Sequence, residues 1–290
     1  MATAVKQLSP PDSKTELAKQ LGVSRSALYY QPKLPVKDLA LKARIEQVMS
    51  AHKAYGHKRI AMELKVNKKR IRRVMKLFGL QVKRKRKKPV KPADTGQAPM
   101  AIPNLVLGLT IEAPHAVWVS DFTYLPFFGK FVYLATVEDV FTRRVVGWAV
   151  GTKHTTNLVM LALLDALFAH PAPNIIHSDQ GSEYRNQTYL NLLHSLNIRP
   201  SMSAKASPWQ NGYQESFYSG FKLELGHPEC YETLGELIEA IAQQIYYYNH
   251  HRIHTALKCP PAVFAARFLQ PYESTNKVLI HREITVRQSV

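Results

Sequence analysis

The sequence predicts an α/β protein in which a mixed sheet flanked by helices follows small all-α segments. Three observations support this fold class. Residues 1–100 hold 25 Lys and Arg against 6 Asp and Glu, whereas residues 101–290 hold 14 against 15. Three runs rich in β-branched and aromatic residues begin after about residue 115. Strand-like and helix-like runs then alternate, which is typical of α/β folds.

The uneven charge distribution indicates the kind of partner. The chain has a net charge of +18, and the whole excess lies in the N-terminal third. This pattern favours a polyanion-binding module joined to a near-neutral one, and double-stranded DNA is the expected polyanion. An anionic membrane is a weaker candidate, because the sequence lacks a long basic helix with a broad apolar face.

The same composition predicts a cytoplasmic protein that does not enter membranes. The first residues lack the apolar core of a signal peptide, and the most apolar helical stretch, 158–169, is interrupted by Asp165 and too short to span a bilayer. Two cysteines, Cys230 and Cys259, are too few for a disulfide framework or a zinc site.

Residues 1–34 are expected to form a helix-turn-helix segment. Gly22 permits the turn and Ser24 is a good N-cap for the second helix. Because such a second helix commonly enters the major groove, Arg25 is predicted to contact DNA. A small helical hairpin without DNA contact is the alternative.

Residues 35–82 are expected to form a second basic helical segment, with an amphipathic helix over 36–53 and a helix pair over 58–64 and 67–78. The last helix lacks nearby acidic partners in the sequence, which favours a DNA-facing helix over an ordinary solvated one. Its predicted DNA contacts are Lys68, Lys69, Arg70, Arg72 and Arg73.

Residues 83–113 are expected to be a basic, proline-containing linker. Like charges in a row repel one another and do not fold alone, so a flexible segment that follows DNA phosphates is the favoured interpretation. A nuclear address is the competing interpretation. The predicted contacts are Lys83, Arg84, Lys85, Arg86, Lys87 and Lys88.

Residues 114–270 are expected to form the α/β domain, and the tail 271–290 has no assigned role. Three antiparallel strands should come first, followed by alternating helices and strands and then by closing helices. The expected strands are 117–124, 131–137, 144–150, 174–178 and 198–202, and the expected helices are 157–169, 187–196, 213–225, 233–248 and 261–268.

Three carboxylates are the candidate catalytic and metal-binding residues. Asp121 interrupts an apolar strand, where an unpaired carboxylate is costly, Asp179 ends a short buried strand, and Glu215 begins a helix. Taken singly, Asp179 could be a turn residue and Glu215 a surface residue. Carboxylates gathered from distant parts of a chain suit hard divalent cations, and a pair of Mg²⁺ ions suits phosphodiester chemistry. Lys222, on the same helical face as Glu215, is predicted to contact phosphate.

Other polar residues carry weaker expectations. Trp209 could stack on a base or pack on its loop, and Asn211 and Arg252 are candidate DNA contacts. Asp139 is interpreted as a strand-end or turn group and Glu183 as a supporting residue at best. For His177, a buried, hydrogen-bonded histidine is favoured over a residue that orients a neighbour. For the histidines at 250, 251 and 254, packing and phosphate contact are favoured over a metal site.

The chain resembles the transposases of bacterial insertion sequences that have a retroviral-integrase-type catalytic core, in particular the large third family with two overlapping reading frames. The resemblance covers about 36–268. It is carried by Trp118-Val119-Ser120-Asp121, by Asp139 through Trp148, by His177-Ser178-Asp179-Gln180-Gly181-Ser182, by Asn211-Gly212 with Glu215-Ser216-Phe217 and Lys222, and by Tyr248-Asn249 with Arg252, His254, Ala256, Leu257 and Pro261.

The resemblance implies an RNase H-like fold and a catalytic triad of Asp121, Asp179 and Glu215. It implies Mg²⁺-dependent cleavage that frees 3′-hydroxyls at the element ends, with Mn²⁺ as a possible substitute, followed by attack of the 3′-hydroxyl on another phosphodiester. The implied partners are the element's terminal repeats, target DNA, further copies of the chain and the product of an upstream reading frame. Nucleoid association in a bacterial cytoplasm follows. Ile253 departs from the family pattern, which usually has a proline there.

Two other functions remain open on the sequence. A cellular nuclease of the same fold is disfavoured by the two N-terminal DNA-binding segments. A DNA-binding repressor with an inactive core is disfavoured by the intact triad with Lys222.

Overall fold

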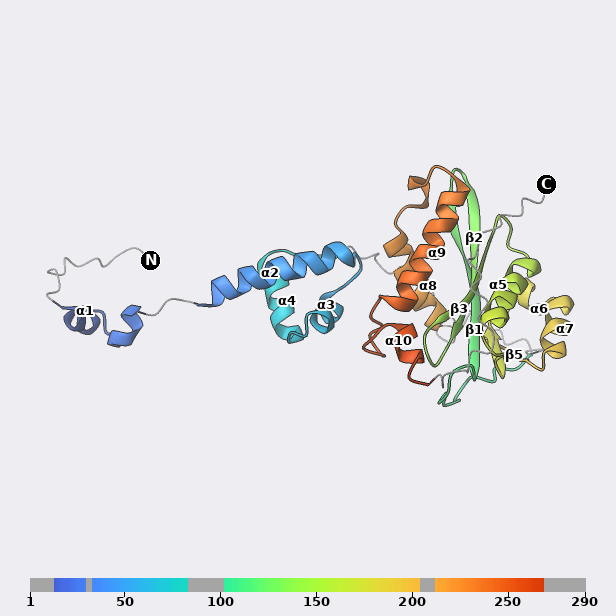
Figure 1. Ribbon diagram of the computed structural model, residues 1–290, viewed down its shortest axis with the longest axis horizontal. Coiled ribbons are helices and arrows are strands. Elements are labelled where there is room, and N and C mark those ends of the chain that lie inside the picture. Colours follow the sequence, from blue (N-terminus) through green and yellow to red (C-terminus); the bar gives the residue numbers. More distant parts are fainter. Residues whose placement is uncertain (1–12, 30–32, 83–101, 204–211, 269–290) are drawn as a thin grey trace, which may run out of the picture.

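The computed structural model describes residues 13–29, 33–82, 102–203 and 212–268 (Figure 1). A helical N-terminal part precedes an α/β domain, as expected. None of the helices within these ranges has the length and apolar composition needed to cross a bilayer.

The first helical segment differs from the prediction in its second element. Helix α1 (Lys14–Gln20) begins at an N-cap, because the Ser13 side chain accepts a hydrogen bond from the backbone N–H of Glu16. Gly22 makes the turn with φ of +64°. The second element, η1 (Arg25–Tyr29), is a 3₁₀ helix of 5 residues rather than an α-helix. The Ser24 hydroxyl lies 3.0 Å from that of Ser26, a local pairing of the kind that competes with helix capping.

Three further helices follow, α2 (Lys33–Ala51), α3 (His57–Glu63) and α4 (Lys68–Leu77). Helix α2 begins three residues before the expected position, since a proline in the first turn is tolerated there. Asn67 caps α4 by accepting from the N–H of Lys69, and Gly79, with φ of +64°, follows its end. The helices share an apolar core that includes Ile45, Ile60, Ile71 and Val74, and Ile253 of the α/β domain joins it.

The α/β domain is built on a five-stranded sheet with the order β3-β2-β1-β4-β5. The first three strands form the expected antiparallel meander, and β4 and β5 extend it in parallel. The strands are β1 (Val117–Phe127), β2 (Lys130–Asp139), β3 (Val145–Gly151), β4 (Ile175–Ser178) and β5 (Arg199–Met202).

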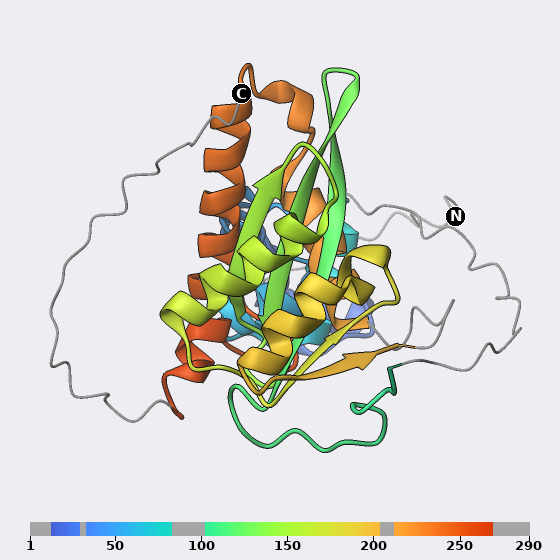
Figure 2. The same cartoon turned by 90° about the vertical axis from the view of Figure 1, so that its right-hand side faces the viewer.

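Helices cover both faces of the sheet (Figure 1). One layer holds α5 (Thr156–Ala169), α6 (Ser182–Arg185) and α7 (Gln187–Ser195), and Figure 2 shows α5 and α7 lying across the front of the sheet. The other layer holds α8 (Gly212–Leu225), α9 (Leu234–His250) and α10 (Pro261–Ala265), with the short η3 (Pro228–Cys230) between α8 and α9. Trp118 and Leu163 belong to the core under the first layer, and Leu134 and Phe221 belong to the core under the second.

Candidate active site

The sheet register brings Asp121 and Asp179 together. Strands β1 and β4 are parallel, and Val119 is the partner of His177. Two residues farther along each strand direction, β1 reaches Asp121 and the chain after β4 reaches Asp179. Since neighbouring strands are about 4.8 Å apart, the two carboxylates lie side by side at the point where β4 ends. Residues that are 58 positions apart in the sequence therefore become neighbours.

Glu215 reaches the same place on α8, which buried hydrogen bonds fasten to the sheet. The Gln214 amide donates to the carbonyl of Val119 at 2.9 Å, and the Tyr218 hydroxyl donates to the carbonyl of Asp121 at 2.7 Å. The Thr136 hydroxyl lies 2.8 Å from that of Tyr218 and also donates to the Gln214 side chain. Buried networks of this kind fix position, because an unpaired polar group in the interior is costly. The helix that carries Glu215 is thus held on the strand that carries Asp121.

The pKa of Asp121 is shifted by these surroundings. It is raised from the ordinary value of 3.8 to about 7, mainly by burial and also by the negative charges of Asp179 and Glu215. A hydrogen bond from the N–H of Phe122 and the positive charge of Lys222 act in the opposite direction. Perturbed carboxylates of this kind are typical of catalytic sites, and a cluster of like charges is relieved when a cation binds.

Lys222 lies beside the same strand. Its ammonium donates to the carbonyl of Tyr124 at 2.9 Å and lies 4.8 Å from the centre of the Tyr124 ring. These contacts place the positive charge near Asp121, at the edge where the carboxylates converge.

Asp179 is supported by a tight turn. Its Oδ1 accepts from the N–H of Gly181 at 2.9 Å. A Cβ atom at position 181 would lie 3.0 Å from that oxygen and 3.0 Å from Oε2 of Glu183, so the turn brings both carboxylates close to the glycine. Glu183 pairs with His154 at 2.7 Å. Burial raises the pKa of Glu183, but hydrogen bonds from His154 and Ser182 outweigh it and keep the pKa below its ordinary value.

The carboxylates have the chemistry of a metal site without the closed geometry of one. Oxygen donors on Asp121, Asp179 and Glu215 are those that Mg²⁺ prefers. Within the ranges that the structure describes, however, no group of three or more His, Cys, Asp or Glu side chains is placed to hold a metal ion. Glu215 is exposed, near the start of its helix.

Most of the described residues predicted to bind DNA are exposed on the helical segments. They are Arg25, Lys68, Lys69, Arg70 and Arg72. Lys83, Arg84, Lys85, Arg86, Lys87, Lys88, Trp209 and Asn211 lie outside the described residues, as does the tail 271–290.

Two of the predicted DNA contacts, Arg73 and Arg252, have an acidic partner within the protein. Arg73 pairs with the buried carboxylate of Asp38 on α2 at 2.6 Å, so α4 does have an acidic partner. Arg252 pairs with Glu224 on α8 at 2.7 Å, and both side chains are more than nine-tenths buried. Sequence distance concealed both pairs, which form only when the helices pack.

The expectation for Asp139 is confirmed, and that for His177 is confirmed in part. Asp139 is fully buried at the end of β2 and accepts from the N–H groups of His115 and Phe141, which is a turn role. His177 is buried, and its Nδ1 lies 2.9 Å from the hydroxyl of Ser201. Its Nε2 lacks a hydrogen-bond partner among the described residues, so the ring is only half satisfied. Burial lowers the pKa of His177 to about 4.

Sequence reasoning missed the residues that assemble the site from beneath. Gln214 and Tyr218 flank Glu215 on α8, and Glu138 lies on β2. Glu138 could have been found from the sequence, because it is a carboxylate in a largely apolar strand. The same signal indicated Asp121.

Comparison with known proteins agrees with this geometry. The integrase core domain family matches residues 111–208, and a second integrase core domain family matches 196–261. The transposase for insertion sequence element IS904 of Lactococcus lactis is 37% identical over 227 residues, covering 75% of this chain and 89% of that protein. The transposase for insertion sequence element IS629 of Shigella sonnei is 30% identical over 234 residues, covering 78% of this chain and 79% of that protein.

Among solved structures, the HTLV-2 integrase catalytic core domain in complex with magnesium is 19% identical with a TM-score of 0.42, covering 53% of this chain and 97% of that one. The mixed sheet with helices on both faces, the two family matches and the transposase relatives lead to one classification. The chain belongs to the family of insertion-sequence transposases with an integrase core domain.

Proposed function

We propose that this protein binds the ends of an insertion element, cleaves them to free 3′-hydroxyls and transfers those hydroxyls to another DNA phosphodiester. The observation that carries the proposal is the position of Asp121. Its carboxyl is partly buried, and its pKa is raised to about 7 by burial and by Asp179 and Glu215. These residues, with Lys222, come from β1, from the chain directly after β4 and from α8 of an integrase core.

Asp121, Asp179 and Glu215 are the residues that would hold two Mg²⁺ ions, with Mn²⁺ as a substitute. The crowding of negative charge around Asp121 supports this assignment, since a divalent cation offsets it. The chemistry supplied by such ions is activation of the attacking oxygen and stabilisation of the leaving 3′ oxygen. Glu215 stands on the first turn of α8.

The residues of the chain itself bind and orient the DNA strand. Lys222 offers an ammonium to a phosphate beside Asp121. Gln214 and Tyr218 hold α8 on β1, and so keep Glu215 in line with Asp121. Gln214 and Tyr218 are positioning residues, because their polar groups are used in hydrogen bonds within the protein.

The helical segments supply DNA affinity. Exposed Lys and Arg side chains on α4 attract phosphates, and the same electrostatic term makes binding fall steeply with salt. Terminal repeats and target DNA are the proposed partners. Because two element ends must be brought together, several copies of the chain are expected on the DNA, with the product of an upstream reading frame as a further partner. A cytoplasmic, nucleoid-associated location follows from these partners.

The test is strand cleavage and joining on a labelled duplex that carries the terminal repeat of the element. With Mg²⁺, the wild-type protein should nick the repeat and join the 3′ end to a second duplex, and Glu215→Gln should do neither while binding the duplex equally well. Equal cleavage by both proteins would remove Glu215 from the mechanism. Tight binding with no cleavage by either protein would favour a repressor with an inactive core.

A further inference from the structure

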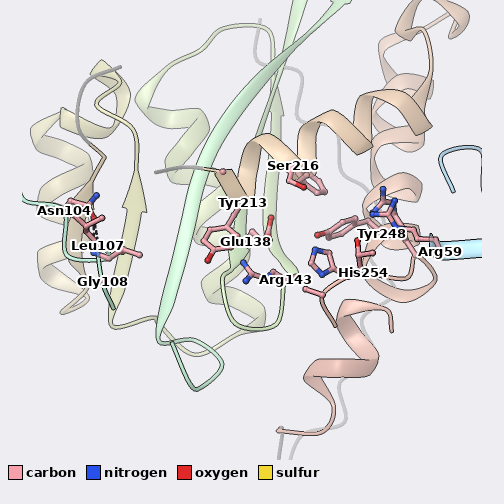
Figure 3. A pocket seen from close by; sticks show the side chains of 16 residues that line it. Arg59, Asn104, Leu107, Gly108, Glu138, Arg143, Tyr213, Ser216, Tyr248 and His254 are labelled. Carbon is pink, nitrogen blue, oxygen red and sulfur yellow. Dashed lines mark hydrogen bonds between the residues drawn. The ribbon is translucent and has the colours of Figure 1, made fainter. Parts of the chain in front are cut away.

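A cavity of about 580 Å³ lies next to the candidate active site (Figure 3). Figure 3 shows Tyr213, Glu138 and Arg143 close together, with Tyr248, His254 and Arg59 beyond them. The volume of the cavity is within the range of about 300–1,000 Å³ that is usual for small-molecule sites.

The cavity and the carboxylates share one face of the sheet. Glu138 is the register partner of Val119, and Asp121 is the partner of Thr136, two residues farther along each strand. Alternation along a strand therefore puts Glu138 and Asp121 on the same side. The first turn of α8 separates the two places, since Tyr213 and Ser216 line the cavity and Glu215 lies between them in the sequence.

Three buried polar atoms, each on a residue that lines the cavity, have no hydrogen-bond partner in the described part of the chain. They are Oε2 of Glu138, Nη1 of Arg143 and Nδ1 of His254. The Glu138 residue is 2% exposed, and a buried polar atom without a partner costs stability. Three such atoms beside one cavity favour a ligand with hydrogen-bonding groups, which these side chains could meet by turning toward it.

The charge states favour a ligand with both donors and acceptors. Burial raises the pKa of Glu138 to about 8, although Arg143 lowers it, so its carboxyl is mostly neutral near pH 7 and able to donate. Burial lowers the pKa of His254 to about 4, which leaves a neutral ring.

Arg143 forms a flat stacking surface at the cavity. The carbon of its guanidinium lies 4.0 Å from the centre of the Tyr213 ring. The Arg143 backbone has φ of +61°, an unfavourable conformation for a residue with a side chain. Strain of this kind is often kept where a side chain must be aimed. Guanidinium planes and aromatic rings are the surfaces on which unpaired nucleobases stack.

Arg59 connects the cavity to the DNA-binding helices. It comes from α3, and its Nε donates to the carbonyl of Ile253 at 2.9 Å. The N–H of Ile253 in turn donates to the Tyr55 hydroxyl at 2.7 Å, so α3 is fixed against the catalytic domain. The cavity thus lies where the helical part and the core meet, and Arg59 and Arg143 bring two positive charges to it.

We propose that this cavity binds one unpaired nucleotide of the DNA strand next to the cleavage site. The base stacks on Arg143 and Tyr213 with its polar edge toward Glu138 and His254, and the phosphate pairs with Arg59. The inference rests on the proposed strand cleavage, because it concerns the DNA that the same face of the sheet would act on.

The experiment measures binding of the full-length protein to two duplexes of one sequence in EDTA. One duplex ends in a base-paired 2-aminopurine, and the other ends in an unpaired 2-aminopurine. Wild type should bind the duplex with the unpaired end about tenfold more tightly, because stacking of one base contributes about tenfold or more to affinity. Binding should also change the fluorescence of the unpaired 2-aminopurine. Tyr213→Leu and Arg143→Gln should lose the preference, and Tyr213→Phe should keep it. Arg72→Gln, on α4, should weaken both duplexes equally.

Equal affinity of wild type for the two duplexes would overturn the proposal. So would an equal loss on both duplexes in Tyr213→Leu, provided that its melting temperature matches that of Tyr213→Phe. Displacement of the unpaired end by free dAMP at a concentration comparable to that of the duplex would show a site for free nucleotides instead. The assay needs no cleavage, so a protein that prefers the unpaired end but never cuts with Mg²⁺ contradicts only the proposed function.

Discussion

Replacing Asp121 by Asn should make the metal-free protein more stable at alkaline pH. The folded state holds the pKa of this carboxyl at about 7, well above the ordinary value of 3.8. Between these values the folded protein binds a proton that the unfolded chain does not, so its stability falls as pH rises toward and through 7. A difference of roughly three pKa units corresponds to about 4 kcal/mol above pH 7, taken as an upper limit.

The Asn side chain removes the charge but keeps a polar group in the site, so a gain of about 1–3 kcal/mol is expected at pH 8. The gain should shrink by more than half at pH 5, where the Asp121 carboxyl of the folded wild type is protonated. Effects of other buried groups, such as Glu138, cancel because both proteins contain them.

Urea unfolding of wild type and Asp121→Asn in EDTA, at pH 5 and pH 8, measures the difference directly. Glu112→Gln, a change at an exposed carboxylate, is the matched control and should stay within about 0.5 kcal/mol of wild type at both values. Mg²⁺ should stabilise wild type more than Asp121→Asn, through preferential binding to the folded state. An Asp121→Asn protein that is less stable than wild type at pH 8 would refute the reasoning.

Three further outcomes are expected. Gly147→Ala should cost at least about 1–3 kcal/mol in urea unfolding, because the new Cβ would lie 2.4 Å from the Ala162 carbonyl oxygen; an unchanged midpoint would contradict this packing. Arg252→Met should cost about 3–5 kcal/mol by leaving the Glu224 carboxylate buried without its partner; unchanged stability with weakened DNA binding would restore the DNA-contact interpretation. Arg72→Gln should leave stability nearly unchanged and reduce the slope of log affinity against log salt by about 1, measured by fluorescence anisotropy; an unchanged slope would take Arg72 out of the DNA interface.

Local pattern was enough to predict the sheet. Each core strand coincides with a run of apolar and β-branched residues. Strands β1 and β2 are longer than expected, because they continue into the hairpin that joins them. The short α6 and η3 were not predicted, because elements of three or four residues have too little periodicity to detect. The 3₁₀ form of η1 was missed for a similar reason, since a good cap residue does not fix which kind of helix follows.

Asp121 was also accessible from the sequence, because a carboxylate in an apolar strand is unusual wherever it lies. Asp179 and Glu215, which singly could be a turn residue and a surface residue, were selected by the family motifs around them. The sequence did not show which charged side chains would form ion pairs between distant helices. Arg252 and Glu224 are separated by 28 positions and meet only through the packing of α9 against α8. The same limitation hid the cavity, whose walls come from α3, the segment 104–108, β2 and the turn after it, α8, α9 and the loop 252–256. Charge runs predict an affinity for DNA, whereas pairing in the folded state decides which of the charges are available.

The most direct test of the account is whether Asp179 is a metal ligand. Asp179→Cys replaces a hard oxygen donor by a thiol, which binds Mg²⁺ poorly and softer divalent ions better. Strand cleavage of the terminal-repeat duplex should be lost in Mg²⁺ and partly restored in Mn²⁺, with wild type active in both and Asp179→Ala active in neither. Cleavage by Asp179→Cys at the wild-type rate in Mg²⁺ would contradict the claim that these three carboxylates hold the catalytic ions.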